Sequence, residues 1–327
     1  MTNFNIVSGG VFPELAQEIA KKLNKQLIGV ELKRFANGER YVRYTESVRQ
    51  KNLFIVQSFS ENNGYTLNDA LIELFLLIDA AKRASAQEIT AVLPILPYAR
   101  QDRKARNREP ISVSIILRTL ETIGINRIIT VDLHSAQTQA IVNLPFDHLI
   151  ASPLISAALK KVVSKSPSDY LLVSPDAGRA KETEQYAENL DLDYIHLPKS
   201  RDRQNSSKIS RPAQITGVKG KKCIIIDDMI DTGGTLITAA ETLQRSGAKD
   251  IIIATTHGIL SNNAAERFKN SPISKLYIVD TISQAQNQSI LGDKLEIIPI
   301  APLMAKAIKR IATGQSLDFM FDGKNNK

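Results

Sequence analysis

The sequence predicts an α/β protein with two tandem domains, each a mostly parallel sheet flanked by helices. Short apolar, β-branched segments alternate with segments of helical periodicity, which is typical of parallel strands covered by helices on both faces. The chain has 327 residues, and about 150 residues per domain corresponds to about two domains. The alternation restarts after Ser152-Pro153, which divides the chain into halves of similar size.

The first half alternates expected strands with two expected helices. Residues 66–84 show the clearest helical spacing, because apolar side chains recur there on one face. These side chains are Leu67, Leu71, Leu74, Phe75 and Ile78. The expected strands of this half are residues 28–32, 53–57, 89–93 and 127–131, and its second helix is residues 111–123.

The second half repeats this alternation. In each half an apolar strand runs into an acidic turn, at residues 128–132 and again at 224–228, which indicates a duplicated domain. The expected helices are residues 154–163, 180–189 and 236–246, and the expected strands are 170–173, 194–197, 222–226 and 250–255. We expect domains at residues 1–150 and 151–327, with the final helix able to pack back on the first domain.

Composition excludes several classes of protein. Hydrophobic residues make up 43% and charged residues 23% of the chain, which excludes a disordered protein. The single cysteine, Cys223, excludes an internal disulfide framework and is typical of a reducing compartment. No apolar run approaches the roughly 18 residues needed to cross a bilayer, and the first residues lack the pattern of a signal peptide. We therefore expect a cytoplasmic protein without membrane contact.

The chain is basic, with 42 Lys and Arg residues against 34 Asp and Glu residues and a net charge of +8. Such a balance suits either nucleic acid or phosphorylated substrates. Nucleic-acid modules usually add stacking aromatic residues, whereas aromatic residues here make up 6% of the chain and Trp is absent. We therefore expect phosphorylated small molecules, and not nucleic acid, as binding partners.

The segment 221–235 carries the strongest functional signal. An apolar strand ends in Asp227 and Asp228, and a turn with Gly233 and Gly234 then leads into a helix. Ligands of open α/β sheets bind beyond the carboxyl ends of the strands, where glycine and helix N-terminal N–H groups form a nest for a phosphate dianion. The two carboxylates would repel that phosphate and would accept hydrogen bonds from vicinal sugar hydroxyls. The pattern therefore indicates a phosphorylated pentose.

The alternative for this segment is an ordinary strand, turn and helix with Asp and Thr caps. Three acids, two Gly and two Thr within residues 227–235 favour the functional interpretation. Neither G-x-x-x-x-G-K-[ST] nor G-x-G-x-x-G occurs in the chain, so this is not one of the common phosphate loops. The stretch resembles the phosphoribosyl-diphosphate loop of type I phosphoribosyltransferases. Its form, Asp-Asp-Met-Ile-Asp-Thr-Gly-Gly-Thr, is similar to that of the ribose-phosphate diphosphokinase (PRPP synthetase) family.

The resemblance implies two tandem domains of the phosphoribosyltransferase type, with a ribose 5-phosphate site in the second. The 5-phosphate would be held by the turn and the start of the helix, and the ribose hydroxyls by the strand carboxylates. The residues implied are Asp227, Asp228, Asp231, Thr232, Gly233, Gly234 and Thr235.

Residues 97–110 and 199–212 are rich in Arg and Lys, lack apolar periodicity and are long for connections in a compact domain. The first follows an expected strand, and clustered cations on a loop suit a polyphosphate, although a solvated surface run is the alternative. This segment resembles the family's ATP-binding loop, which implies that Arg100 and Gln101 contact the nucleotide.

The second of these segments opens with Lys199 and Arg201. The residues alone leave a surface loop as an equal alternative. The resemblance implies that both side chains stabilise the transition state, by offsetting charge that grows on the transferred group. Arg201 would also contact ribose 5-phosphate.

The segment Arg-Phe-Ala-Asn-Gly-Glu at residues 34–39 resembles the family's adenine-contacting turn, which in related oligomers reaches a neighbouring subunit's site. The resemblance implies that Phe35 stacks on the base and that Asn37 and Glu39 hydrogen-bond to it, with Gly38 in the turn. A plain β-turn around Asn-Gly describes the same backbone.

The segment Asp132-Leu133-His134 ends an expected strand. A lone His is more often structural than a ligand, so the residues alone are weak support for a metal site. The resemblance implies that His134 and Asp176 hold Mg²⁺, the implied cofactor. Because Mg²⁺ prefers oxygen ligands, part of the role of His134 would run through water.

The resemblance runs from about Asn5 to the tail at residues 319–321. It implies transfer of the β,γ-diphosphoryl group of ATP to the 1-hydroxyl of ribose 5-phosphate, giving PRPP and AMP for nucleotide biosynthesis. It further implies a homo-oligomer, a hexamer in the family. Regulatory contacts would gather at Ser47, Arg49 and Arg106.

Two alternatives stay open at this point. A phosphoribosyltransferase that consumes PRPP shares the 227–235 turn, but it does not predict the Arg-Gln-Asp-Arg loop at residues 100–103. A non-catalytic regulatory paralogue would bind the ligands or an active partner. The presence of Lys199, Arg201, His134 and Asp176 argues against that alternative.

Overall fold

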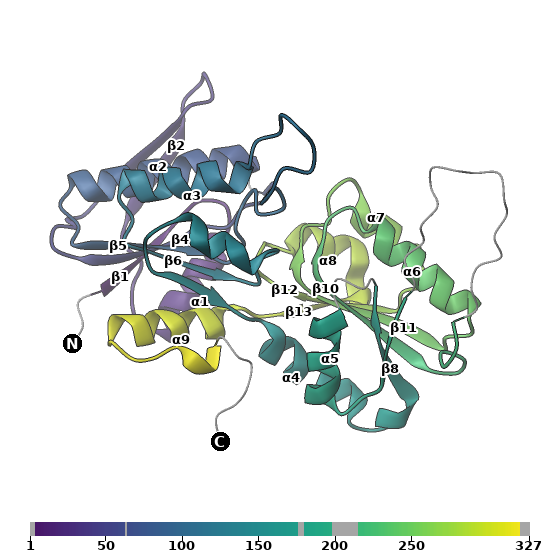
Figure 1. The fold of residues 1–327 in the computed structure, drawn as a ribbon. Coiled ribbons are helices and arrows are strands. Elements are labelled where there is room, and N and C mark those ends of the chain that lie inside the picture. Colours follow the sequence, from purple (N-terminus) through teal and green to yellow (C-terminus); the bar gives the residue numbers. More distant parts are fainter. Residues whose placement is uncertain (1–3, 63, 176–179, 198–214, 321–327) are drawn as a thin grey trace. The chain divides into compact units, whose positions relative to one another are not determined.

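The computed structural model describes residues 4–62, 64–175, 180–197 and 215–320. The chain forms two compact units (Figure 1). The first unit comprises Met1–Ala151, Thr281–Ser283 and Pro299–Lys327, and the second comprises Ser152–Asp280 and Gln284–Ile298. The end of the chain therefore belongs to the first unit.

The first unit is built on a five-stranded parallel sheet with the order β1-β4-β5-β6-β7. Its strands are β1 (Phe4–Ser8), β4 (Asn52–Val56), β5 (Glu88–Leu93), β6 (Arg127–Val131) and β7 (Phe146–Leu149). Ile55, Val92 and Ile129 of the inner strands are fully buried. Both faces of the sheet are covered, and for that reason these strands are continuously apolar.

Four α-helices cover this sheet among the described residues. They are α1 (Pro13–Lys22), α2 (Leu67–Arg83), α3 (Ser112–Ile123) and α9 (Ala301–Ala312). Figure 1 shows α2 and α3 on one face of the sheet and α1 and α9 on the other, and α9 packs on α1. Short 3₁₀ helices occur at Ala136–Ile141 and Asp318–Met320.

The helix α2 begins with a complete capping box. Thr66 is the N-cap, its side chain accepts a hydrogen bond from Asp69 N, and the Asp69 carboxylate accepts one from the Thr66 backbone. Leu71, Leu74 and Ile78 are buried on its inner face, as the helical spacing predicts. An antiparallel hairpin of β2 (Val30–Arg34) and β3 (Arg40–Tyr44) packs on this helix through β3.

The second unit is built on a six-stranded parallel sheet with the order β13-β12-β11-β10-β8-β9. Its strands are β8 (Tyr170–Ser174), β9 (Tyr194–His196), β10 (Lys222–Ile230), β11 (Asp250–Gly258), β12 (Lys275–Val279) and β13 (Leu295–Ile298). The central strands β10 and β11 are the longest, with nine residues each. They run beyond their shorter neighbours.

Helices again cover both faces of the sheet. They are α4 (Ser152–Val163), α5 (Ala180–Leu190), α6 (Gly234–Arg245), α7 (Ala264–Lys269) and α8 (Ala285–Leu291), with 3₁₀ turns at Pro167–Asp169 and Gly292–Lys294. One buried cluster joins Ile225 and Ile253 of the sheet to Leu236 of α6 and Phe268 of α7. The core of this unit therefore places α6 and α7 against the same face of the central strands.

The predicted α/β architecture of parallel sheets flanked by helices is confirmed. The main difference lies at β10, which continues to Ile230 instead of ending before Asp227. The reason is the pairing with β11, in which Asp227 lies beside Thr255 and Ile230 beside Gly258. None of the described helices is both long enough and apolar enough to span a bilayer.

Candidate functional site

The two adjacent carboxylates lie inside β10, beyond its pairing with β8. That pairing ends at Ile225, so Asp227 and Asp228 follow the last residue that has a partner on that side. Successive side chains of a strand point to opposite faces, which puts Asp227 on the face that packs on α6. Asp228 is 8% exposed, and its N–H donates to Asp227 Oδ1 at 2.9 Å.

The turn after β10 requires a glycine at residue 233. Gly233 has φ 73°, and a Cβ at this position would lie 2.4 Å from the buried ring of Phe268. Gly233 is also the N-cap of α6, where its lack of a side chain leaves the first helical N–H groups without a side-chain cap. Those N–H groups and the helix dipole make this end of α6 suited to an anion.

Two side chains from a later segment hold the turn. The Ser261 hydroxyl donates to Asp231 Oδ1, and Arg267 Nη1 donates to the Thr232 carbonyl at 2.9 Å. Neither Ser261 nor Arg267 is predicted from the sequence as a site residue. No spacing rule links them to the turn, since they follow β11 and are brought to it only by packing in the sheet.

The end of β10 and the start of α6 offer hydrogen-bond acceptors and hydrogen-bond donors at separate places. Thr232 and Thr235 are exposed beside the helix N-terminus, where hydroxyls and N–H groups can donate to a phosphate. The carboxylates of Asp227 and Asp228 are acceptors when ionised and can receive hydrogen bonds from hydroxyls. A ligand with a phosphate at one end and adjacent hydroxyls at the other matches both.

The sole thiol of the chain does not belong to this chemistry. Cys223 is fully buried in β10, and burial raises the pKa of its thiol to about 12. A thiol with that pKa is protonated at neutral pH, so it is excluded as a nucleophile.

In the first unit, residues 34–39 form the tip of the β2–β3 hairpin. Phe35 N donates to the Glu39 carbonyl at 2.8 Å, and Gly38 N donates to the Phe35 carbonyl at 2.9 Å. Gly38 has φ 96°, the left-handed conformation that such hairpin turns need. Asn37 Oδ1 accepts from Glu39 N at 3.2 Å, which shapes the turn.

The ring of Phe35 is presented at this tip. It is 51% exposed and meets the Tyr41 ring edge-on at a centroid distance of 5.7 Å. An exposed aromatic ring on a structured turn is available for stacking on a planar base. The hairpin tip thus contains all four residues predicted to contact adenine, because they are close in the sequence. They are Phe35, Asn37, Gly38 and Glu39.

The segment 97–110 contains no helix or strand, in agreement with the expected loop. Arg100 is exposed at its start. Gln101 N donates to the Tyr98 carbonyl at 3.2 Å, and Gln101 Oε1 accepts from the Ser112 hydroxyl at the start of α3. Gln101 is therefore anchored near the start of the loop, and the exposed Arg100 precedes it.

His134 is exposed on the turn that follows β6. Asp132 at the start of this turn has φ 38°, and Ala151 N lies 3.3 Å from both of its carboxylate oxygens. Leu133 N donates to His148 Nε2 at 2.8 Å. These contacts fix the backbone from which the His134 side chain projects.

The residues near His134 are compatible with a Mg²⁺ ion that is bound partly by the protein and partly by substrate phosphates. No three His, Cys, Asp or Glu side chains among the described residues are grouped to hold a metal ion. Mg²⁺ is usually held by one or two protein groups together with water and substrate phosphates, and not by a closed protein cage. An exposed His134 at the carboxyl edge of a sheet, with one carboxylate from elsewhere, is compatible with that pattern.

The proposed regulatory residues lie at two places in the first unit. Arg49 N donates to Ser47 Oγ at 3.4 Å, and Arg49 Nη1 donates to Ser85 Oγ at 3.4 Å. Arg106 is exposed in the 97–110 loop, where its N–H donates to Glu109 Oε2 at 2.9 Å. Among the described contacts, none joins Arg106 to Ser47 or Arg49.

Three predicted site residues lie outside the described part of the chain. They are Asp176, Lys199 and Arg201. The roles of these three residues therefore remain predictions from the sequence.

Comparison with known proteins covers nearly the whole chain. The model of the N-terminal domain of ribose phosphate pyrophosphokinase matches residues 4–124, and that of the phosphoribosyl synthetase-associated domain matches residues 202–322. A ribose-phosphate pyrophosphokinase of Streptomyces avermitilis is 40% identical over 315 residues, which are 96% of this chain and 95% of that protein. One of Bifidobacterium longum is 40% identical over 323 residues, 98% of this chain and 93% of that protein. The chain belongs to the ribose-phosphate pyrophosphokinase family.

The fold agrees with this family. The crystal structure of phosphoribosylpyrophosphate synthetase from Mycobacterium smegmatis matches with a TM-score of 0.85 and 38% sequence identity. The match covers 95% of this chain and 99% of that one. The family resemblance drawn from the motifs is therefore confirmed, and with it membership of a family of diphosphotransferases.

Proposed function

We propose that this chain transfers the β,γ-diphosphoryl group of ATP to the 1-hydroxyl of ribose 5-phosphate, giving PRPP and AMP for nucleotide biosynthesis. Membership of the ribose-phosphate pyrophosphokinase family supports the reaction. The observation that carries the proposal is the 227–235 turn, where a glycine-capped helix end follows two strand carboxylates.

In the second unit, the turn from Asp231 to Thr235 holds the 5-phosphate with its N–H and hydroxyl groups. Asp227 and Asp228 accept hydrogen bonds from the ribose hydroxyls. Ser261 and Arg267 keep the turn in shape from behind. The absence of a side-chain cap at Gly233 supports these roles, because the first N–H groups of a helix have no acceptor within the helix and a phosphate can accept from them.

In the first unit, the adenine base stacks on Phe35 and hydrogen-bonds to Asn37 and Glu39 at the turn of Gly38. Arg100 and Gln101 hold the polyphosphate. The exposure of Phe35 and Arg100 supports these roles. A homo-hexamer, in which this hairpin reaches a neighbour's site, is part of the same proposal, as are regulatory contacts at Ser47, Arg49 and Arg106.

His134 and Asp176 would hold Mg²⁺, which would neutralise part of the charge of the ATP phosphates. The anomeric hydroxyl of the sugar attacks the β-phosphorus of ATP. A new O–P bond forms, the bond from the β-phosphorus to the oxygen shared with the α-phosphorus breaks, AMP leaves with that oxygen, and the hydroxyl proton is released to solvent. Lys199 and Arg201 offset the charge that develops on the transferred group, so positioning and electrostatics supply most of the rate.

The test is AMP release from ATP and ribose 5-phosphate by the purified chain, with no nucleobase and no other subunit present. We expect stoichiometric AMP and PRPP. A consumer of PRPP would release no AMP under these conditions, and neither would a non-catalytic paralogue.

Lys199→Ala serves as the catalytic control in this assay. It should lower kcat by at least about tenfold while the KM values for ATP and ribose 5-phosphate change little, because the contact is made in the transition state. An unchanged kcat would remove Lys199 from the mechanism and leave the reaction itself in place.

A further inference from the structure

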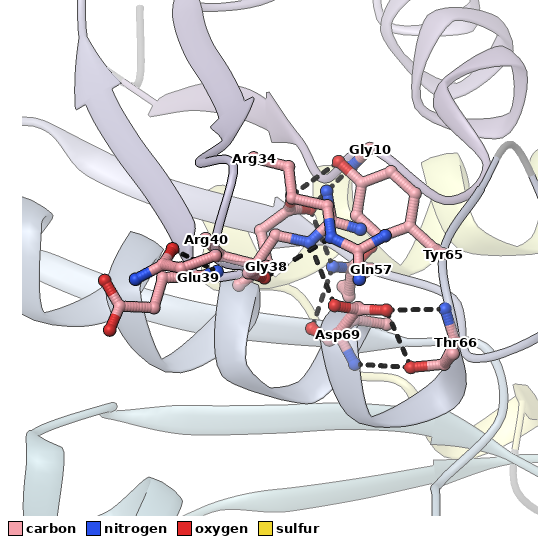
Figure 2. Close-up of polar contacts among 12 residues, drawn as sticks. Gly10, Arg34, Gly38, Glu39, Arg40, Gln57, Tyr65, Thr66 and Asp69 are labelled. Carbon is pink, nitrogen blue, oxygen red and sulfur yellow. Dashed lines mark hydrogen bonds and ion pairs between the residues drawn. The ribbon is translucent and has the colours of Figure 1, made fainter.

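A buried cation anchors the β2–β3 hairpin next to its tip. Arg40 follows Glu39 directly, and its side chain is only 7% exposed. Its guanidinium lies over the Tyr65 ring at 3.5 Å from the centroid, and its Nε lies 3.3 Å from Asp69 Oδ1 at the start of α2 (Figure 2). A buried charge that loses its counter-charge is strongly destabilising. Asp69 therefore fixes where Arg40, and with it the hairpin, can lie.

Asp69 is itself held in one orientation. Its Oδ2 accepts from Thr66 N at 2.9 Å and from Thr66 Oγ1 at 2.7 Å, which leaves Oδ1 directed at Arg40 (Figure 2). These hydrogen bonds from Thr66, with the charges of Arg40 and Arg34, lower the pKa of Asp69. The carboxylate is thus ionised at neutral pH and is held by Thr66.

The ring beneath Arg40 is fixed from the sheet side. Tyr65 Oη donates to Glu73 Oε2 at 2.6 Å. Glu73 Oε1 accepts from Gly10 N at 2.8 Å and from Gln57 Nε2 at 3.1 Å, at the carboxyl ends of β1 and β4. Burial and the Glu73 carboxylate raise the pKa of Tyr65, so its hydroxyl stays a donor. These hydrogen bonds hold the Tyr65 ring against the ends of the two strands.

Asn68, which precedes Asp69 in α2, contacts the loop at residues 97–110. Tyr98, on the loop that carries Arg100 and Gln101, donates its hydroxyl to Asn68 Oδ1 at 2.6 Å. Tyr98 has φ 60°, which is unfavourable for a side chain of its size. Such a conformation persists where surrounding contacts hold it. The bond to Asn68 is one of them.

We propose that Asn68 and Asp69 are positioning residues for ATP, a role that rests on the proposed function. Asn68 holds the polyphosphate loop through Tyr98, and Asp69 holds the adenine hairpin through Arg40. Two ATP-contacting segments that lie about 60 residues apart in the sequence are thus set by adjacent residues of one helical turn. These two roles hold whether the hairpin contributes to the ATP site of its own protomer or to that of a neighbouring protomer.

The test compares Tyr98→Phe and Asp69→Asn with matched controls. Tyr98→Phe removes one hydroxyl from a side chain that is 39% exposed, and it should raise the KM for ATP roughly threefold. Asp69→Asn keeps the shape of the side chain, removes the counter-charge of Arg40 and should raise the KM for ATP roughly tenfold. The KM for ribose 5-phosphate should not change in either variant, an asymmetry that general destabilisation would not produce.

The controls remove similar contacts away from α2. Tyr194→Phe removes a hydroxyl that bonds to Glu184 at 3.0 Å from a side chain 37% exposed. Glu31→Gln breaks the pair with Arg43 on the same hairpin. Both should keep the wild-type KM for ATP. Should Asp69→Asn fail to fold, Asn68→Ala tests the same turn through the Tyr98 contact.

Equilibrium binding of ATP separates this proposal from the proposed function. Wild-type protein that binds ATP but forms no AMP would contradict the reaction alone. Tyr98→Phe and Asp69→Asn proteins that bind ATP as tightly as the wild type would overturn the positioning role and leave the reaction standing. A KM for ribose 5-phosphate that rises together with that for ATP would also overturn it.

Discussion

At the level of single residues, the turn at residues 231–235 contains two glycines with different constraints. Gly233 combines φ 73° with a neighbouring Phe268 ring at 2.4 Å from any added Cβ. Gly234 has no such φ, and the nearest atom to an added Cβ is Arg267 Nη2 at an ordinary 3.6 Å. The first glycine is therefore required by the fold. The fold does not require the second glycine, which agrees with the proposed approach of a phosphate to its backbone.

This difference predicts opposite behaviour for two alanine substitutions. Gly233→Ala should lower the free energy of unfolding by about 2–4 kcal/mol, from left-handed strain and overpacking. Gly234→Ala should change it by no more than about 0.5–1 kcal/mol, yet raise the KM for ribose 5-phosphate. Urea denaturation and steady-state kinetics measure the two effects. Equal stability of the two variants would contradict the assignment of Gly233 to the fold.

At the level of elements, α2 connects the sheet edge of the first unit to the hairpin and to the 97–110 loop. The pattern of apolar residues on α2 predicts only its buried face. Its first turn has a second set of contacts, through Thr66, Asn68 and Asp69, that periodicity does not reveal. Polar residues in a first turn are expected as caps, and here the same residues also hold other segments.

The lowered pKa of Asp69 predicts a pH-dependent contribution to stability. Since the folded pKa lies below the ordinary value of 3.8, ionised Asp69 stabilises the fold above that pH. The contribution is lost as the pH falls through the folded pKa. The stability difference between wild type and Asp69→Asn should therefore be full at pH 7 and shrink below about pH 3.8. Chemical denaturation at pH 7, 4 and 3 measures it.

Asp79→Asn is the matched control on the same helix. Asp79 pairs with Arg83 at 2.7 Å on the exposed face of α2. Exposed pairs of this spacing contribute little to stability. The stability difference between wild type and Asp79→Asn should therefore be small at pH 7, 4 and 3. A difference for Asp69→Asn that does not depend on pH would contradict the role of its charge.

At the level of the whole molecule, the chain order and the compact units do not coincide. Residues after Pro299 belong to the first unit, where α9 packs on α1. Met304 and Ile308 of this helix are fully buried. The first unit therefore becomes complete only when the end of the chain has been made.

A core substitution in α9 should act on the first unit alone. Met304→Ala should cost about 2–5 kcal/mol, from lost burial and the cavity that remains. Hydrogen exchange should rise in β1 and α1 and stay unchanged in β10 and β11. Lys309→Ala, at an exposed position of the same helix, should change neither. An equal rise in both units would contradict this division of the core.

The sequence by itself determined what adjacent residues can encode. Apolar spacing predicted α2 and the central strands, and the run of acids, glycines and threonines at residues 227–235 predicted a glycine turn that leads into a helix. These features depend on local backbone geometry, so their residues lie together in any fold. The tip at residues 34–39 was predictable for the same reason.

Only the tertiary structure decided which distant side chains support these features. It brought Ser261 and Arg267 to the turn at residues 231–235, Tyr98 to Asn68, Arg40 to Asp69, and α9 to α1. Each is a contact between segments far apart in the chain, selected by the packing of strands and helices. Periodicity records which face of an element is buried, but not which partner covers it, and for that reason these contacts had to be seen.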